Sequence, residues 1–151
     1  PGCSNAHVFS HAGKPWLTQY WVRRVKEQAY GAIGPDRGYG GHDEDQGQMG
    51  GVSSLMAIGL FALDGGSSRD PQYDITSPVF DEVTISLDAD YYKGKSFKIK
   101  TYNNSATNCY IQRAQLNRKE YNSFQIPHTV FSDGGVLELW LGDTPNEAWG
   151  K

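Results

Sequence analysis

Hydrophobic residues recur with a helical period in the first third of the chain. Leu17, Trp21 and Val25 follow one another at four-residue spacing, and Pro15 just before them suits the first turn of a helix. The glycine-rich sequence that comes soon afterwards is typical of a helix end. The pattern therefore predicts a helix over residues 15–30.

A second helical pattern covers residues 48–63. Four glycines in or beside it lower its intrinsic helical propensity, which indicates close packing against neighbours or a ligand. One side of this predicted helix is lined by Met49, Val52, Met56, Gly59, Leu60 and Leu63.

After Asp64 the hydrophobic period changes from helical to two. Val83, Ile85 and Leu87 alternate with polar residues, as in a half-buried strand. Asn117-Arg118-Lys119 and Asp133-Gly134-Gly135 are typical of tight turns. Strands are predicted over residues 83–87, 96–101, 109–116 and 136–141.

Helices followed by antiparallel-style strands predict an α+β fold in which the two kinds of element are segregated. We expect a helical segment over residues 1–65 and a β-rich region over residues 66–151. The aromatic residues of the helical segment need more packing partners than that segment supplies; they are Trp16, Tyr20, Trp21 and Tyr30. The chain is therefore expected to be a piece of a larger helical assembly or to need a partner.

Composition narrows the function classes. Of the 151 residues 38% are hydrophobic, which is enough for a packed core, and the formal charge of −3 gives no attraction to nucleic acid or anionic membranes. The chain has no apolar run near the ~20 residues that span a bilayer. Cys3 and Cys109 can form one disulfide at most, so cysteine usage leaves the compartment open.

The segment most suggestive of chemistry runs from Gly38 to Met49 and contains three consecutive acids, Asp43, Glu44 and Asp45. One interpretation is structural, because acids near a helix N-terminus are stabilised by the helix dipole. The other is a site, because glycines let a ligand approach the backbone. An EF-hand is excluded, since Ser54 stands where its bidentate glutamate is needed. The residues alone leave both interpretations open.

A two-carboxylate hydrolase site is the better chemical hypothesis for these acids. Asp43 and Asp45 are two residues apart, so in an extended loop they point the same way while Glu44 points elsewhere. Such a pair can hold one water, with one acid taking its proton and the other orienting it.

Three stretches in this order and spacing resemble the C-terminal part of glycoside hydrolase family 92. They are His11-Ala12-Gly13-Lys14-Pro15-Trp16-Leu17-Thr18-Gln19, Asp43-Glu44-Asp45-Gln46-Gly47-Gln48-Met49 and Ser77-Pro78-Val79-Phe80, and the likeness covers essentially the whole chain. The resemblance implies a calcium-dependent, inverting exo-α-mannosidase built from a β-sandwich and an (α/α)6 barrel. This chain would then supply the C-terminal helices of the barrel, followed by an antiparallel β-rich layer.

The resemblance also implies roles for particular residues. Asp45 is the expected general base with Asp43 assisting, and the general acid is a glutamate expected just upstream of Pro1. Because that acid and the rest of the catalytic domain are expected upstream, we predict that the isolated chain is inactive. The chain departs from the usual family sequence at His42 and at Gly50-Gly51-Val52-Ser53-Ser54. The wall of its pocket is therefore expected to differ from that of other family members.

Substrate, cofactor and location follow from the same resemblance. The expected substrate is a mannose-containing glycan with terminal α-linked mannose (α1,2-mannosidase-like), and the expected cofactor is Ca²⁺. The protein is expected to be periplasmic, at the cell surface or secreted. The rival hypothesis is a non-catalytic carbohydrate-binding or structural β module, in which the acids only cap a helix. For His7, His11 and Cys3, structural roles are the favoured interpretation.

Overall fold

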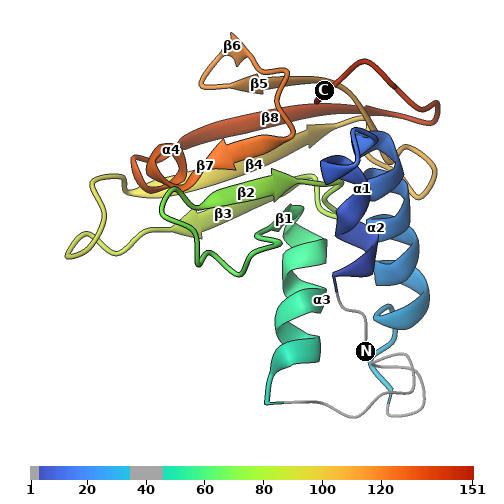
Figure 1. Ribbon diagram of the computed structural model, residues 1–151, viewed down its shortest axis with the longest axis horizontal. Helices are drawn as coiled ribbons and strands as arrows, with labels where there is room; N and C mark the ends of the chain where they lie inside the picture. Colours follow the sequence, from blue (N-terminus) through green and yellow to red (C-terminus); the bar gives the residue numbers. More distant parts are fainter. Residues whose placement is uncertain (1–3, 35–45) are drawn as a thin grey trace.

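The computed structural model describes residues 4–34 and 46–151, and the helices of its N-terminal part stand side by side beneath two sheets (Figure 1). The long helices α2 and α3 pack on each other, and the short helix α1 packs on α2. The helices and the single 3-10 turn in this part of the chain are η1 (Asn5–His7), α1 (Val8–His11), α2 (Pro15–Ala29), α3 (Gln48–Ile58) and α4 (His128–Ser132).

The strands form a small sheet, β1-β2-β7, and a larger one, β3-β4-β8-β5-β6. All pairs are antiparallel except β4 and β8, which run parallel with Phe97 opposite Gly135. The prediction of an antiparallel layer is therefore wrong for this pair, and the larger sheet is mixed. The reason is that the chain crosses over between β4 and β8 and so returns in the same direction. The strands are β1 (Leu60–Phe61), β2 (Gln72–Ile75), β3 (Glu82–Ser86), β4 (Ser96–Tyr102), β5 (Tyr110–Leu116), β6 (Lys119–Glu120), β7 (Gln125–Pro127) and β8 (Gly135–Gly142).

The larger sheet buries the apolar face that the alternating pattern predicts. In β4, Phe97 and Ile99 are fully buried while Lys98 and Lys100 are partly exposed, and Leu137 and Leu139 of β8 lie beside them in the same core. The predicted turn at residues 117–119 is confirmed by the positive φ angles of 51° and 67° at its first two residues.

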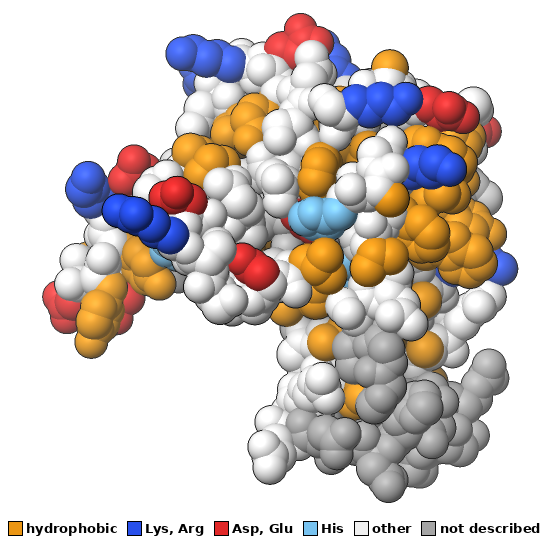
Figure 2. All heavy atoms as spheres, in the orientation of Figure 1, with side chains coloured by type: hydrophobic (Ala, Val, Ile, Leu, Met, Phe, Trp, Pro, Cys, Tyr) orange, Lys and Arg blue, Asp and Glu red, His pale blue; other side chains and the backbone are white. Residues whose placement is uncertain are grey.

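Helix α2 confirms the first predicted helix, and its buried side combines Val22 with three polar residues. Thr18, Gln19 and Arg23 are buried, whereas Trp21 is 43% exposed. A patch of hydrophobic side chains accordingly gathers on the surface at α2 (Figure 2). The predicted apolar stripe is therefore only in part the packing face. Val25 packs against the helical core, whereas Trp21 lies at the surface, and Gln19 and Arg23 bond to the sheet region.

Helix α3 is shorter than predicted. It ends at Ile58, because Gly59 adopts a left-handed conformation with φ of +81°, and residues 60 and 61 form strand β1 instead of continuing to Leu63. The apolar side of the predicted helix is nevertheless buried at Met49, Val52 and Met56.

We predict that Gly59→Ala lowers the free energy of unfolding by about 3 kcal/mol. An added Cβ would lie 2.5 Å from Cγ of Pro78, and alanine is strained at this φ angle. Gly51→Ala is the matched control within α3, where a Cβ meets no described atom within 4 Å. Its expected effect is a gain of about 0.5–1 kcal/mol from helix propensity. Urea denaturation of both variants tests this, and equal effects would contradict it.

Candidate functional site

The acid pair Asp43 and Asp45 lies outside the described residues, as do Cys3 and the position next to the inferred upstream acid. The structure does describe where the following helix begins. The N-cap of α3 is Gly47, with φ of 85°, and the first turn of α3 contains no acidic residue. The structural interpretation of the acids concerns residues 43–45, so it stays a prediction.

Two buried side chains of α2 bond to parts of the chain that are far away in sequence. The Arg23 guanidinium donates to the carbonyl oxygens of Pro78 and Ser105, and to Oδ1 of Asn104 at 2.8 Å. Four residues earlier, Oε1 of Gln19 accepts the N–H of Ile111 at 2.8 Å. These bonds join α2 to both the 77–80 segment and the larger sheet.

Sequence reasoning did not single out Arg23. The available signal was the pair of polar residues four apart on one face of a helix, Gln19 and Arg23. Such a pair is normally solvated, and here the exposed fraction of Arg23 is 5% and that of Gln19 is 1%.

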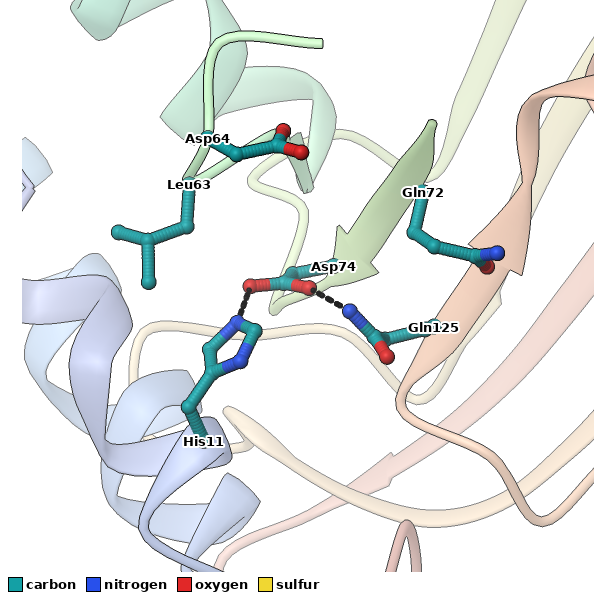
Figure 3. A pocket seen from close by; sticks show the side chains of 6 residues that line it. All are labelled: His11, Leu63, Asp64, Gln72, Asp74 and Gln125. Carbon is teal, nitrogen blue, oxygen red and sulfur yellow. Dashed lines mark hydrogen bonds and ion pairs between the residues drawn. The ribbon is translucent and has the colours of Figure 1, made fainter. Parts of the chain in front are cut away.

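A polar pocket of about 330 Å³ lies between α1, the loop after β1, and strands β2 and β7 (Figure 3). At its floor Asp74 receives a hydrogen bond from each side. Nε2 of His11 lies 2.6 Å from Oδ2, and Nε2 of Gln125 donates to Oδ1 at 3.0 Å. The residues that line the pocket are His11, Leu63, Asp64, Gln72, Asp74 and Gln125.

The two carboxylates of this pocket have opposite environments. Burial raises the pKa of Asp74, an effect that the hydrogen bonds from His11 and Gln125 partly offset. The backbone N–H of Gly66 lowers the pKa of the exposed Asp64, whose Oδ1 accepts it at 2.9 Å. Asp64 is therefore ionised at neutral pH.

The structural interpretation of His7 is supported by its surroundings. Its ring is fully buried and stacks on Phe61 with 3.7 Å between centroids and 9° between planes. Neither ring nitrogen has a hydrogen-bond partner among the described residues. Burial lowers the pKa of His7 from 6.5 to about 4.

His7 should make the protein less stable in acid. Between pH 6.5 and about 4 the unfolded chain binds a proton at His7 that the folded chain does not, so stability falls as the pH falls through this window. We predict a loss of about 3 kcal/mol across it from this residue alone. His7→Phe keeps the stack on Phe61 and should flatten the dependence by that amount. Urea denaturation at pH 7 and pH 4 measures the free energy of unfolding of both proteins. An equal loss of stability between the two pH values in wild type and His7→Phe would contradict the prediction.

Cys109 has the properties of a structural cysteine. Its thiol is free and 5% exposed, and burial raises its pKa, which disfavours the reactive thiolate. Among residues 4–34 and 46–151, no group of three or more His, Cys, Asp or Glu could hold a metal ion. None of the helices in that part of the chain is long and apolar enough to cross a membrane.

Comparison with known proteins places these motifs in a family. Residues 1–143 match the model of the glycosyl hydrolase family 92 catalytic domain. A family GH92 inverting mannosidase from Bacteroides thetaiotaomicron is 34% identical with a TM-score of 0.83, and the match covers 96% of this chain and 18% of that protein. A GH92 α-mannosidase from the same organism is 25% identical, with the same TM-score and coverage.

A curated relative extends the comparison to a fungus. The protein described as an uncharacterized secreted glycosidase of Arthroderma benhamiae is 33% identical over 150 residues, which are 95% of this chain and 17% of the relative. The chain thus spans less than a fifth of the length of each of these three relatives. Because residues 1–143 match the family model, the chain belongs to glycoside hydrolase family 92.

Proposed function

We propose that this chain is part of an inverting exo-α-mannosidase that removes terminal α-linked mannose from glycans. The observation that carries the proposal is the family match over residues 1–143, which includes the acidic motif. A similar solved structure is described as an inverting mannosidase, at 34% identity.

Asp45 is the proposed general base and Asp43 its assistant. In an inverting glycosidase one carboxylic acid protonates the leaving oxygen, while a carboxylate activates water on the opposite face of the sugar. The two groups are roughly 6.5–9.5 Å apart to accommodate that water. In our proposal the acid is a glutamate upstream of Pro1, so this chain contributes the half of the site that activates water.

The same proposal assigns residues 1–65 to the end of an (α/α)6 barrel and residues 66–151 to a β-rich C-terminal region. The 43% exposure of Trp21 supports further helices packing on α2. The isolated chain is proposed to be inactive because the acid and most of the barrel lie outside it.

Calcium is proposed as the cofactor on family membership alone. In the family it would act on sugar hydroxyls as an oxygen-binding cation. The described residues offer no cluster of acids or histidines that fits it, so no step is assigned to the ion here. Secretion, or location at the cell surface or in the periplasm, is proposed from the relative that is described as secreted.

The rival carbohydrate-binding module needs an open aromatic face for a sugar ring. Trp140 lies on β8, in the middle of the larger sheet. The Arg113 guanidinium on β5 lies 3.8 Å from its ring centroid, and Tyr102 on β4 stacks at 4.7 Å. With these neighbours on the two strands that flank β8, Trp140 does not offer an open platform for a sugar ring.

The test is an assay of the full-length protein on α1,2-, α1,3-, α1,4- and α1,6-mannobiosides, with and without EDTA. We expect mannose release from at least one disaccharide, loss of activity in EDTA and recovery on addition of Ca²⁺. Release that is unaffected by EDTA would remove calcium from the proposal. No release from any of the four would contradict the proposed substrate class.

A further inference from the structure

The pocket around Asp74 has no role in the proposed hydrolysis. Its walls come from α1, β2 and β7, at the end of the helices that meets the sheets (Figure 1). The acidic motif instead precedes Gln48, at the other end of α3, and an 11-residue helix is roughly 16 Å long.

The side chains of this pocket converge on a shared space. Asp64 points into it from the loop after β1, and Asp74 and Gln125 lie across from it (Figure 3). Asp74 is 1% exposed and is held by its two hydrogen bonds, so the floor of the pocket is fixed. Its carboxylate is enclosed, so it fixes the positions of His11 and Gln125, which also line the pocket.

The charge of the pocket selects against anions. Two carboxylates face a single imidazole, and no lysine or arginine lines the space. A phosphate, sulfate or carboxylate ligand would therefore be repelled. The three titratable residues do not form a metal-binding group in this part of the chain.

The remaining chemistry matches a neutral polyhydroxyl ligand. Sugar hydroxyls both donate and accept hydrogen bonds, and the pocket offers carboxylates that accept as well as the amides of Gln72 and Gln125, which do both. Leu63 adds an apolar wall for the C–H face of a sugar ring. A volume of about 330 Å³ lies in the range of small-molecule sites.

We propose that this pocket binds a neutral hexose, with Asp64 and Gln72 as the adjustable contacts and Gln125 as the contact that Asp74 holds in place. This goes beyond the proposed function, since the binding requires neither Asp43 nor Asp45. Asp74 is unsuitable for mutation as a first test, because its loss would leave His11 and Gln125 without their partner.

Hydrogen exchange of the full-length protein, with methyl α-mannoside as the probe, tests the proposal. We expect the sugar to slow exchange in peptides that span β2 and β7. Asp64→Asn and Gln72→Ala should each raise the sugar concentration for half-protection at least five-fold. Asp70→Asn is the matched control, since it removes an exposed carboxylate from the same loop that does not line the pocket, and it should behave as wild type.

Three results would overturn the proposal. The first is that the sugar does not protect β2 and β7 in the wild type. The second is that Asp64→Asn and Asp70→Asn need the same sugar concentration for half-protection. The third is that mannose 6-phosphate protects these strands more strongly than the neutral sugar. A mannosidase that fails the first test would still support the proposed function. Conversely, protection of these strands in a protein without mannosidase activity would support the sugar site alone.

Discussion

Asp45→Asn in the full-length protein is expected to lower kcat for mannose release by about 10³-fold or more, the size of a general-base contribution. Asparagine is nearly isosteric with aspartate but cannot take the proton of the attacking water. Binding of substrate depends on other groups, so KM should change much less than kcat. Initial rates on the preferred mannobioside measure both constants.

Glu44→Gln is the control, because it removes the neighbouring carboxylate, which is predicted to point away from the pair. Its kcat should remain within a few-fold of wild type. Asp43→Asn should fall between the two, as expected for a residue that orients the water. Near-normal rates in Asp45→Asn, or equal losses in Asp45→Asn and Glu44→Gln, would remove Asp45 from the role of base.

Arg23→Met is expected to produce the largest loss of stability, about 4 kcal/mol. The guanidinium is buried, and its removal takes a donor from the carbonyl of Ser105 and from Oδ1 of Asn104. The carbonyl of Pro78 keeps only the longer bond from Nδ2 of Asn104, at 3.3 Å. Each buried polar group that loses its partner costs about 1–3 kcal/mol. Arg23→Lys should recover only part of the loss, since an ammonium cannot reproduce the planar fork of donors. Denaturant unfolding of the full-length protein measures both changes.

Arg24→Met is the matched control for Arg23. Arg24 is exposed on the same helix, and its guanidinium carbon lies 6.0 Å from the centre of the Tyr20 ring. Removing it should change stability by less than about 0.5 kcal/mol. Equal effects at the two positions would mean that the bonds of Arg23 to the sheet region contribute little to folding.

The long helix and the longer strands could be predicted because their patterns are local. Residues 96–101 alternate strictly, and β4 follows that alternation with buried Phe97 and Ile99. Strand β2 gives no such signal, because it buries the charged Asp74 beside Ile75. It exists through its pairing with β1 and β7, which lie elsewhere in the sequence. The parallel pairing of β4 with β8 is likewise a property of the chain path, and no local pattern encodes it.

The two candidate sites differ in the same way. The acidic motif is contiguous, so both its chemistry and its family resemblance can be read directly from residues 43–49. The polar pocket joins His11 to Asp74 across 63 residues and Asp74 to Gln125 across 51. Only the packing of α1 against the small sheet brings these side chains together, which is why sequence reasoning placed no site there.

Proton NMR of the full-length protein during hydrolysis of an α-mannobioside tests the central claim most directly. The measurement follows which anomer of mannose is released first. A water activated by Asp45 attacks the face opposite the leaving oxygen, so our account predicts that β-mannose appears first and only later equilibrates with the α anomer. Initial release of α-mannose, or no release of mannose, would contradict it.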